Sequence, residues 1–144
     1  MITLSRKARY ALRALIALAG EGSGSYVLIA DLAAKENIPH KFLESILLQL
    51  KNAGILVSKK GKGGGYALIK PPDQITLGQA IHAIDGSLSS LPCLIEPGVR
   101  CQGCLDEATC STRLLMERTK GAVATILDGT TLASLCLPGL PLVH

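Results

Sequence analysis

A lysine- and glycine-rich segment between two strand-like stretches places the strongest constraint on the fold of this chain. The segment KKGKGGG at 59–65 holds three lysines and four glycines, and it separates residues 55–58 from residues 66–69, which both have strand propensity. This pattern predicts a β-hairpin with a flexible cationic tip, because glycine lets backbones approach closely and lysine neutralises phosphate. A solubilising turn is the alternative. A P-loop is disfavoured because no strand-to-helix context surrounds these glycines.

Two short helices are expected directly before this hairpin. The first covers about eight residues from Ile29, after an extended stretch at 26–28. The second begins near residue 40 and ends at Gly54, with Asn37 as a capping residue and Pro39 in its first turn. Its buried face should consist of Phe42, Leu43, Ile46, Leu47 and Leu50. Two helices joined by a tight turn are typical of a helix-turn-helix, and a hairpin after them predicts a winged helix.

Three more helices are predicted from apolar spacing. One begins after Ser5 and ends at Gly20, and another begins after Thr76 and ends at residues 85–86. The buried face of the first should hold Leu4, Ala8, Ala11, Leu12, Leu15, Ile16 and Ala19. The third covers about 110–129, and its apolar face is formed by Leu114, Leu115, Ala122, Val123, Ile126 and Leu127. Little chain remains to cover that face, so we expect a homodimer, with residues 130–144 packed on the partner or frayed.

The expected fold class is therefore mainly α (α+β). It comprises a winged helix-turn-helix DNA-binding domain at 1–86, a cysteine-rich loop at 87–110, and a dimerisation helix with a C-terminal tail at 111–144. The distribution of charge agrees with this division. Residues 1–70 carry 11 Lys and Arg against 4 Asp and Glu, whereas residues 71–144 carry 4 against 7. A basic N-terminal half suggests a module that binds a polyanion.

Polar side chains in the basic half are candidates for contact with DNA. Arg6, Arg9 and Arg13 should share one face of the first helix, where guanidinium groups either bind phosphate or are simply solvated. The outward face of the second helix of the helix-turn-helix should hold His40, Lys41, Glu44, Ser45 and Gln49.

Four of the five cysteines lie in the loop at 87–110, namely Cys93, Cys101, Cys104 and Cys110. The chain has no apolar run of 18 residues and no signal peptide at its start, so we expect a cytoplasmic protein with reduced thiols and no membrane partner. Thiolates bind zinc and iron–sulfur clusters, and the spacing does not choose between them. Cys136 should be a buried or partly exposed side chain outside this set. No thioredoxin-like pattern surrounds Cys101 and Cys104, and no catalytic constellation is evident, so we do not expect an enzyme.

The segments LSRKARYALRALIALA and FLESILLQLKNAGILVSKKGKGGGYALIKPPDQITLGQAIHAIDG, with the cysteine loop, resemble the Rrf-two family of winged-helix transcription regulators. The resemblance covers about residues 1–130, and its most specific part is the G-x-GGGY-x-L wing followed by PP-x-x-I-T-L. It implies a homodimer that binds palindromic promoter DNA, with the recognition helix in the major groove and the wing in the minor groove. It further implies base reading by Lys41 and Glu44, a backbone contact by Arg6, and wing contacts by Lys59, Lys60, Lys62, Gly63 and Gly64.

The same resemblance implies a cofactor. Many members of this family hold a 2Fe–2S or 4Fe–4S cluster through three cysteines in the loop before the long helix. Here Cys93 and Cys110 fit that pattern with either Cys101 or Cys104, or all four cysteines act as ligands. Arg113 stands where some relatives have a histidine ligand. The expected function is a DNA-binding regulator controlled by the cluster in response to redox state, nitric oxide or iron–sulfur status. The alternative is a zinc-stabilised or metal-free regulator without cluster sensing.

Overall fold

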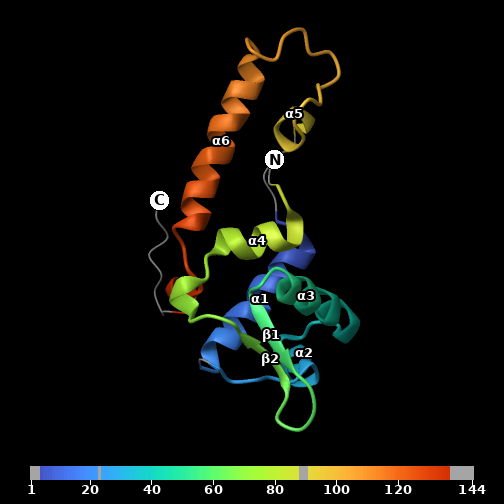
Figure 1. Cartoon of the computed structure of the whole chain (residues 1–144), viewed down its shortest axis with the longest axis vertical. Coiled ribbons are helices and arrows are strands. Elements are labelled where there is room, and N and C mark those ends of the chain that lie inside the picture. Colours follow the sequence, from blue (N-terminus) through green and yellow to red (C-terminus); the bar gives the residue numbers. More distant parts are fainter. Residues whose placement is uncertain (1–3, 23, 88–90, 137–144) are drawn as a thin grey trace.

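A computed structural model gives the structure of the protein and describes residues 4–22, 24–87 and 91–136. Its elements in chain order are α1 (Arg6–Gly20), α2 (Ile29–Glu36), α3 (His40–Asn52), β1 (Leu56–Lys59), β2 (Gly65–Leu68), the 3-10 helix η1 (Pro72–Gln74), α4 (Leu77–Asp85), α5 (Pro92–Ile95), α6 (Ser111–Asp128) and α7 (Leu132–Cys136). In Figure 1, the first four α-helices and the hairpin form one body, and α6 rises away from it toward the cysteine loop. The predicted mainly helical winged-helix fold is confirmed.

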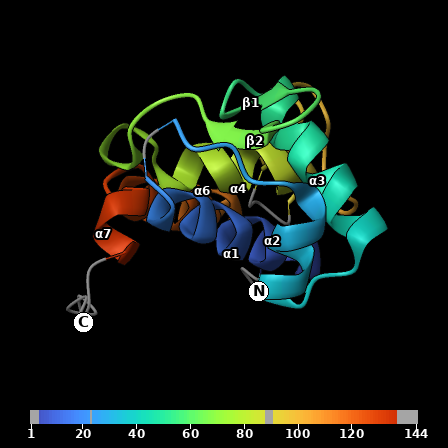
Figure 2. The same cartoon turned by 90° about the horizontal axis from the view of Figure 1, so that it is seen from below.

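The core of this body forms around α1, which Figure 2 shows running through its centre. Leu15 and Leu18 of α1 are almost fully buried, together with Leu43, Ile46 and Leu47 of α3. The buried face predicted for α1 is partly wrong. Its residues Leu12, Ile16 and Ala19 are only half-buried and Leu4 is exposed, whereas Ala14, Ala17 and Leu18 are buried. Because α1 contacts α3 and α4 as well as α7, its buried surface is wider than one line of residues spaced three and four apart.

The wing is an antiparallel hairpin in which Leu56 pairs with Leu68 and Lys59 pairs with Gly65. The extended stretch predicted at 26–28 joins it, because Val27 and Tyr66 exchange two backbone hydrogen bonds of 2.9 Å. Gly65 has a φ of 131°, and a Cβ atom built there would lie 2.1 Å from the carbonyl oxygen of Val27. This position therefore requires glycine for both its conformation and its space.

The helix-turn-helix follows the predicted order, but its turn differs from expectation. Asn37 does not cap α3; it ends α2 in the left-handed conformation with a φ of 52°, and its N–H donates to the carbonyl of Ala33. Asparagine tolerates this conformation better than most residues, which is the reason for the difference. Pro39 occupies the N-cap position of α3, one residue before the predicted first turn.

The ends of two other helices are as predicted. Ser5 caps α1 by accepting a 2.9 Å hydrogen bond from the Ala8 amide, and Thr76 forms a capping box with Gln79 at the start of α4. The loop at 87–110 is less irregular than expected, because the short helix α5 lies within it.

The C-terminal end of α6 is joined by hydrogen bonds and burial to the body formed by the first four α-helices and the hairpin. The Leu77 amide donates to the carbonyl of Thr130 at 2.8 Å, and the Leu132 amide donates to the carbonyl of Ile75 at 2.9 Å. Leu132 is fully buried in the same core as Leu15. The expectation that the tail packs on a partner or frays is thus wrong for Leu132–Cys136, which form α7 against α1 (Figure 2), while 137–144 lie outside the described residues.

Candidate functional site

The outward face of α3 holds the candidate base-reading residues. Lys41, Glu44 and Ser45 are exposed, on the side of the helix opposite the buried Leu43 and Leu47. His40 is also exposed at the start of the helix, as expected. Gln49, expected outward as well, is instead half-buried, and its Oε1 atom has no hydrogen-bond partner among the residues that the structure describes. The exposed polar side chains of α3 therefore lie in its first two turns and at its C-terminal end.

The tip of the wing projects from the body at the end of the molecule farthest from the cysteine loop (Figure 1). Lys59, Lys60, Lys62 and Gly63 are exposed there, as a cationic contact surface requires. Gly64 is buried, and a Cβ atom at this position would lie 2.2 Å from the carbonyl oxygen of Lys59. We conclude that Gly64 shapes the turn through close backbone packing, and that the three lysines supply its exposed charge.

Sequence reasoning missed one aromatic neighbour of the wing. The Lys59 ammonium lies 5.8 Å from the centre of the Tyr26 ring, a distance suited to a cation–π interaction. Tyr26 is partly exposed and immediately precedes Val27, the residue that pairs with β2. The Val27 pairing with Tyr66 is what brings Tyr26 to the wing, and it joins residues 39 positions apart, so periodicity could not reveal it.

The arginines of α1 have different roles. Arg6 is exposed at the start of the helix. Arg13 instead binds the C-terminal end of α2, where its guanidinium donates to the Glu36 carbonyl and its Nε lies 3.7 Å from the Glu36 carboxylate. It also lies 5.8 Å from the Tyr10 ring centre. Arg13 therefore connects α1 to α2, which leaves the exposed Arg6 and Arg9 as candidates for a phosphate contact.

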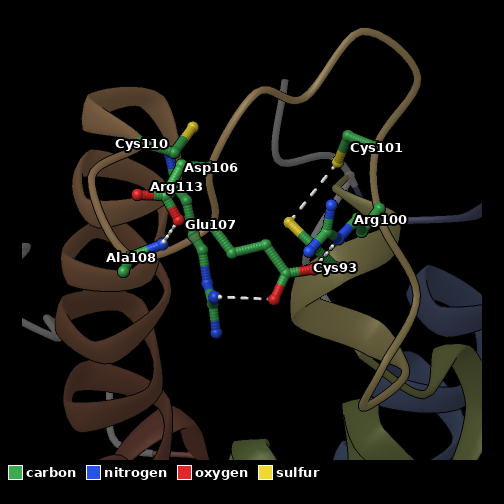
Figure 3. A network of polar contacts seen from close by, with 8 residues as sticks. All are labelled: Cys93, Arg100, Cys101, Asp106, Glu107, Ala108, Cys110 and Arg113. Carbon is green, nitrogen blue, oxygen red and sulfur yellow. Dashed lines mark hydrogen bonds and ion pairs between the residues drawn. The ribbon is translucent and has the colours of Figure 1, made fainter.

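The candidate cofactor site lies between α5 and the start of α6 (Figure 3). Cys93 belongs to α5, and its Sγ lies 3.4 Å from the Sγ of Cys101, which donates a hydrogen bond to it. This hydrogen bond and partial burial raise the pKa of the Cys93 thiol above its ordinary value. The Cys104 amide donates to the Cys101 carbonyl at 3.0 Å, which closes a tight turn. Cys110 caps α6 and accepts a hydrogen bond from the Arg113 amide at 3.4 Å.

An ion-pair network, absent from the sequence predictions, holds this loop (Figure 3). The Glu107 carboxylate lies 3.9 Å from Nε of Arg100 and 3.4 Å from Nη1 of Arg113. Asp106 accepts hydrogen bonds from the Ala108 amide at 3.1 Å and the Thr109 hydroxyl at 3.0 Å. Glu107 thus links the residue before Cys101 to the first turn of α6.

All four loop cysteines line one cavity of about 190 Å³. Thiols are suitable donors for zinc or an iron–sulfur cluster, so the composition of this cavity fits such a group. The four thiols are too far apart to bind one metal ion together. Within 4–22, 24–87 and 91–136, the structure has no group of three His, Cys, Asp or Glu side chains close enough to hold a metal ion. Ligation would require the loop to close around the group. Cys136 is exposed on α7 and does not line this cavity.

Several known proteins are similar to this chain. The sequence model of Rrf2, described as an iron-dependent transcriptional regulator, matches residues 4–137. A putative rrf2-like HTH-type regulator of Rhodobacter capsulatus is 34% identical over 96% of this chain and 95% of its own length. The HTH-type transcriptional regulator IscR of Aliivibrio salmonicida is 33% identical over 92% of this chain and 76% of its own length.

A solved structure is similar over nearly the whole chain. CymR, the global cysteine regulator of B. subtilis, superposes with a TM-score of 0.75 and 32% identity, covering 94% of this chain and 97% of that protein. These relatives are transcription regulators and not enzymes. Separately, none of the described helices is long and apolar enough to cross a membrane.

Proposed function

The chain belongs to the Rrf2 family of transcription regulators, and we propose that it is a homodimer whose promoter binding is controlled by an iron–sulfur cluster in the loop at 87–110. The observation that carries the proposal is that Cys93, Cys101, Cys104 and Cys110 all line one cavity beside the first turn of α6. The iron dependence that describes the family supports a cluster over zinc. A bound cluster would supply a group sensitive to oxygen, nitric oxide and iron supply, as expected of a cytoplasmic sensor.

We assign DNA contact to α3 and the wing. Lys41 and Glu44 on the exposed face of α3 would reach base edges in the major groove, where lysine recognises guanine and a carboxylate recognises cytosine. Lys59, Lys60 and Lys62 would neutralise phosphates around the minor groove. The exposed Gly63 would allow the tip to approach the DNA backbone, and the buried Gly64 would keep the shape of the turn. Arg6, exposed at the start of α1, would contact the DNA backbone.

The homodimer would form through α6. None of its 18 residues is buried, although Leu114, Leu115 and Ile126 are large and apolar and are at least half exposed. A helix with such a surface usually gains stability by packing on a copy of itself. In this arrangement the segment 111–128 joins two winged helices and fixes the separation of their recognition helices, which a palindromic operator requires.

The control mechanism follows from the two ends of α6. Cys110 caps the first turn of this helix, and its last turn leads directly to Thr130, whose carbonyl accepts from the Leu77 amide of α4. A closed cysteine loop would order the first turn and the Glu107 network around it. An open loop would leave the N-terminal end of α6 less ordered. The distance between the two recognition helices of the dimer would then vary.

A metal-free or zinc-bound regulator is the second candidate function. The observation that favours it is the 3.4 Å contact between the thiols of Cys93 and Cys101, which needs no metal. The similarity to a global cysteine regulator also agrees with a cysteine-based signal.

The two candidate functions predict different colours and metal contents for the purified protein. Protein prepared without oxygen should be brown, contain iron and acid-labile sulfide, and protect a site in its own promoter region from nuclease cleavage. Colourless protein with stoichiometric zinc, or without metal, that protects the same site would support the second candidate. Protein that protects no DNA in either form would contradict both.

A further inference from the structure

We propose that Leu48 of α3 reads the methyl group of a thymine in the operator. This inference rests on the proposed function, because it requires α3 to lie in the major groove. It adds to the polar contacts of Lys41 and Glu44 an apolar one, which would determine specificity at a separate base pair.

Leu48 is a large apolar side chain on the exposed face of α3. It is 50% exposed, whereas Leu43, Ile46, Leu47 and Leu50 of the same helix are fully buried. The spacing of 3.6 residues per turn places Leu48 on the same stripe as Lys41, Glu44 and Ser45, which are also exposed. In the part of the chain that the structure describes, the other exposed large apolar side chains lie off α3.

The chemistry of the major groove gives this side chain a specific partner. The C5-methyl of thymine is the apolar group that the base edges present there, and apolar side chains recognise it by contact. The charged neighbours of Leu48 on this face, Lys41 and Glu44, would lie against polar base edges or phosphates. A leucine among them therefore suits a thymine better than any other base.

The helix geometry also predicts where this thymine lies. Glu44 and Leu48 are one turn apart, which is about 6 Å along the helix axis at 1.5 Å per residue. Successive base pairs are about 3.4 Å apart. The thymine contacted by Leu48 should therefore lie within about two base pairs of the cytosine contacted by Glu44.

Uracil provides a direct test, because it differs from thymine only by lacking this methyl group. The full-length protein is first tested for protection of its own promoter region, and failure at this step contradicts the proposed function itself. Each thymine of the protected site is then replaced by uracil at equivalent positions of both half-sites. We expect one position where the wild-type affinity falls by about fourfold per half-site, the factor that corresponds to burial of one methyl-sized group.

The variant Leu48→Ala should bind the uracil and thymine operators equally well, because its shorter side chain no longer reaches the methyl group. Ile69→Ala is the matched control, since Ile69 is also 50% exposed but lies outside α3, and it should keep the wild-type response to uracil. Thermal unfolding of both variants checks that they remain folded. The proposal is overturned if wild-type protein binds the site but responds to uracil nowhere, or if Leu48→Ala keeps the full response.

Discussion

The Sγ atoms of Cys93 and Cys101 lie 3.4 Å apart, although one belongs to α5 and the other lies eight residues later in the loop. Two thiolates on one tetrahedral zinc ion, each about 2.3 Å from the metal, would be separated by about 3.8 Å. The two cysteines are therefore already at a separation close to that of a pair of metal ligands. Cys104 and Cys110 line the same cavity without this contact.

The first prediction concerns the ligands. Cys93→Ala and Cys110→Ala should each abolish cluster binding, because both are expected ligands whether Cys101 or Cys104 completes the three-cysteine set. Cys101→Ala should lower the iron content more than Cys104→Ala does, since Cys101 is the residue in contact with Cys93. Iron and sulfide analysis of protein purified without oxygen measures this. Cys136→Ala, on α7 away from the cavity, is the control and should keep its cluster. Full retention in Cys93→Ala or Cys110→Ala would contradict the proposed site.

A second prediction concerns the wing. Changing Lys59, Lys60 and Lys62 together to alanine should weaken binding to all DNA sequences, because the exposed ammonium groups neutralise phosphates. The slope of log affinity against log salt should become shallower by up to about one unit for each phosphate that is no longer neutralised. Lys35→Ala is a suitable control, since its ammonium lies 2.9 Å from the Glu21 carboxylate on another part of the body. An unchanged slope in the triple variant would mean that the tip only aids solubility.

A third prediction separates specificity from affinity. Glu44 is exposed on α3, where a carboxylate can accept a hydrogen bond from cytosine N4 but repels phosphate. Glu44→Ala should therefore broaden the range of operators selected from a random DNA pool, while total affinity changes little. If the variant selects the wild-type operator with the wild-type stringency, the assignment of this face to the groove is wrong.

The fourth prediction concerns stability. In Gly65→Ala the new methyl group would clash with the Val27 carbonyl, and the φ of 131° is unfavourable for alanine. The free energy of unfolding should fall by about 2 kcal/mol or more, as is typical of strain at such positions. Gly20→Ala, at the end of α1 with no atom within 4 Å of the added carbon, should change it by less than about 1 kcal/mol. Chemical denaturation measures both, and equal stability of the two variants would contradict the structure of the wing.

Local sequence patterns predict the helices, caps and strands that depend on residues close together in the sequence. Spacing and capping chemistry account for the eight residues of α2, for the capping residues Ser5 and Thr76, and for the buried side chains Leu43, Ile46, Leu47 and Leu50. Phe42, expected on the same buried face, is only half-buried. The hairpin is predicted within one residue at each strand, because strand propensity and glycine content mark its limits.

Features produced by distant contacts are not predictable in this way. The burial of Leu132 depends on contact between α7 and α1, and the pairing of Val27 depends on β2. The spacing of the cysteines could not show that Cys101 lies against Cys93, because that contact results from how α5 packs on α6 and how Glu107 holds the loop. The sequence therefore indicates which residues form the candidate site but not their arrangement.

Control of DNA binding by the cysteine loop can be tested by one titration with promoter DNA. The affinity of oxygen-free protein for its own promoter DNA should be measured before and after removal of iron with a chelator, on the same preparation. If the loop controls binding, one of the two states should bind the operator specifically, and the affinity of the other should be at least about tenfold weaker, a difference of about 1.4 kcal/mol. Equal affinity of the iron-loaded and iron-free protein for the operator would contradict control by the loop.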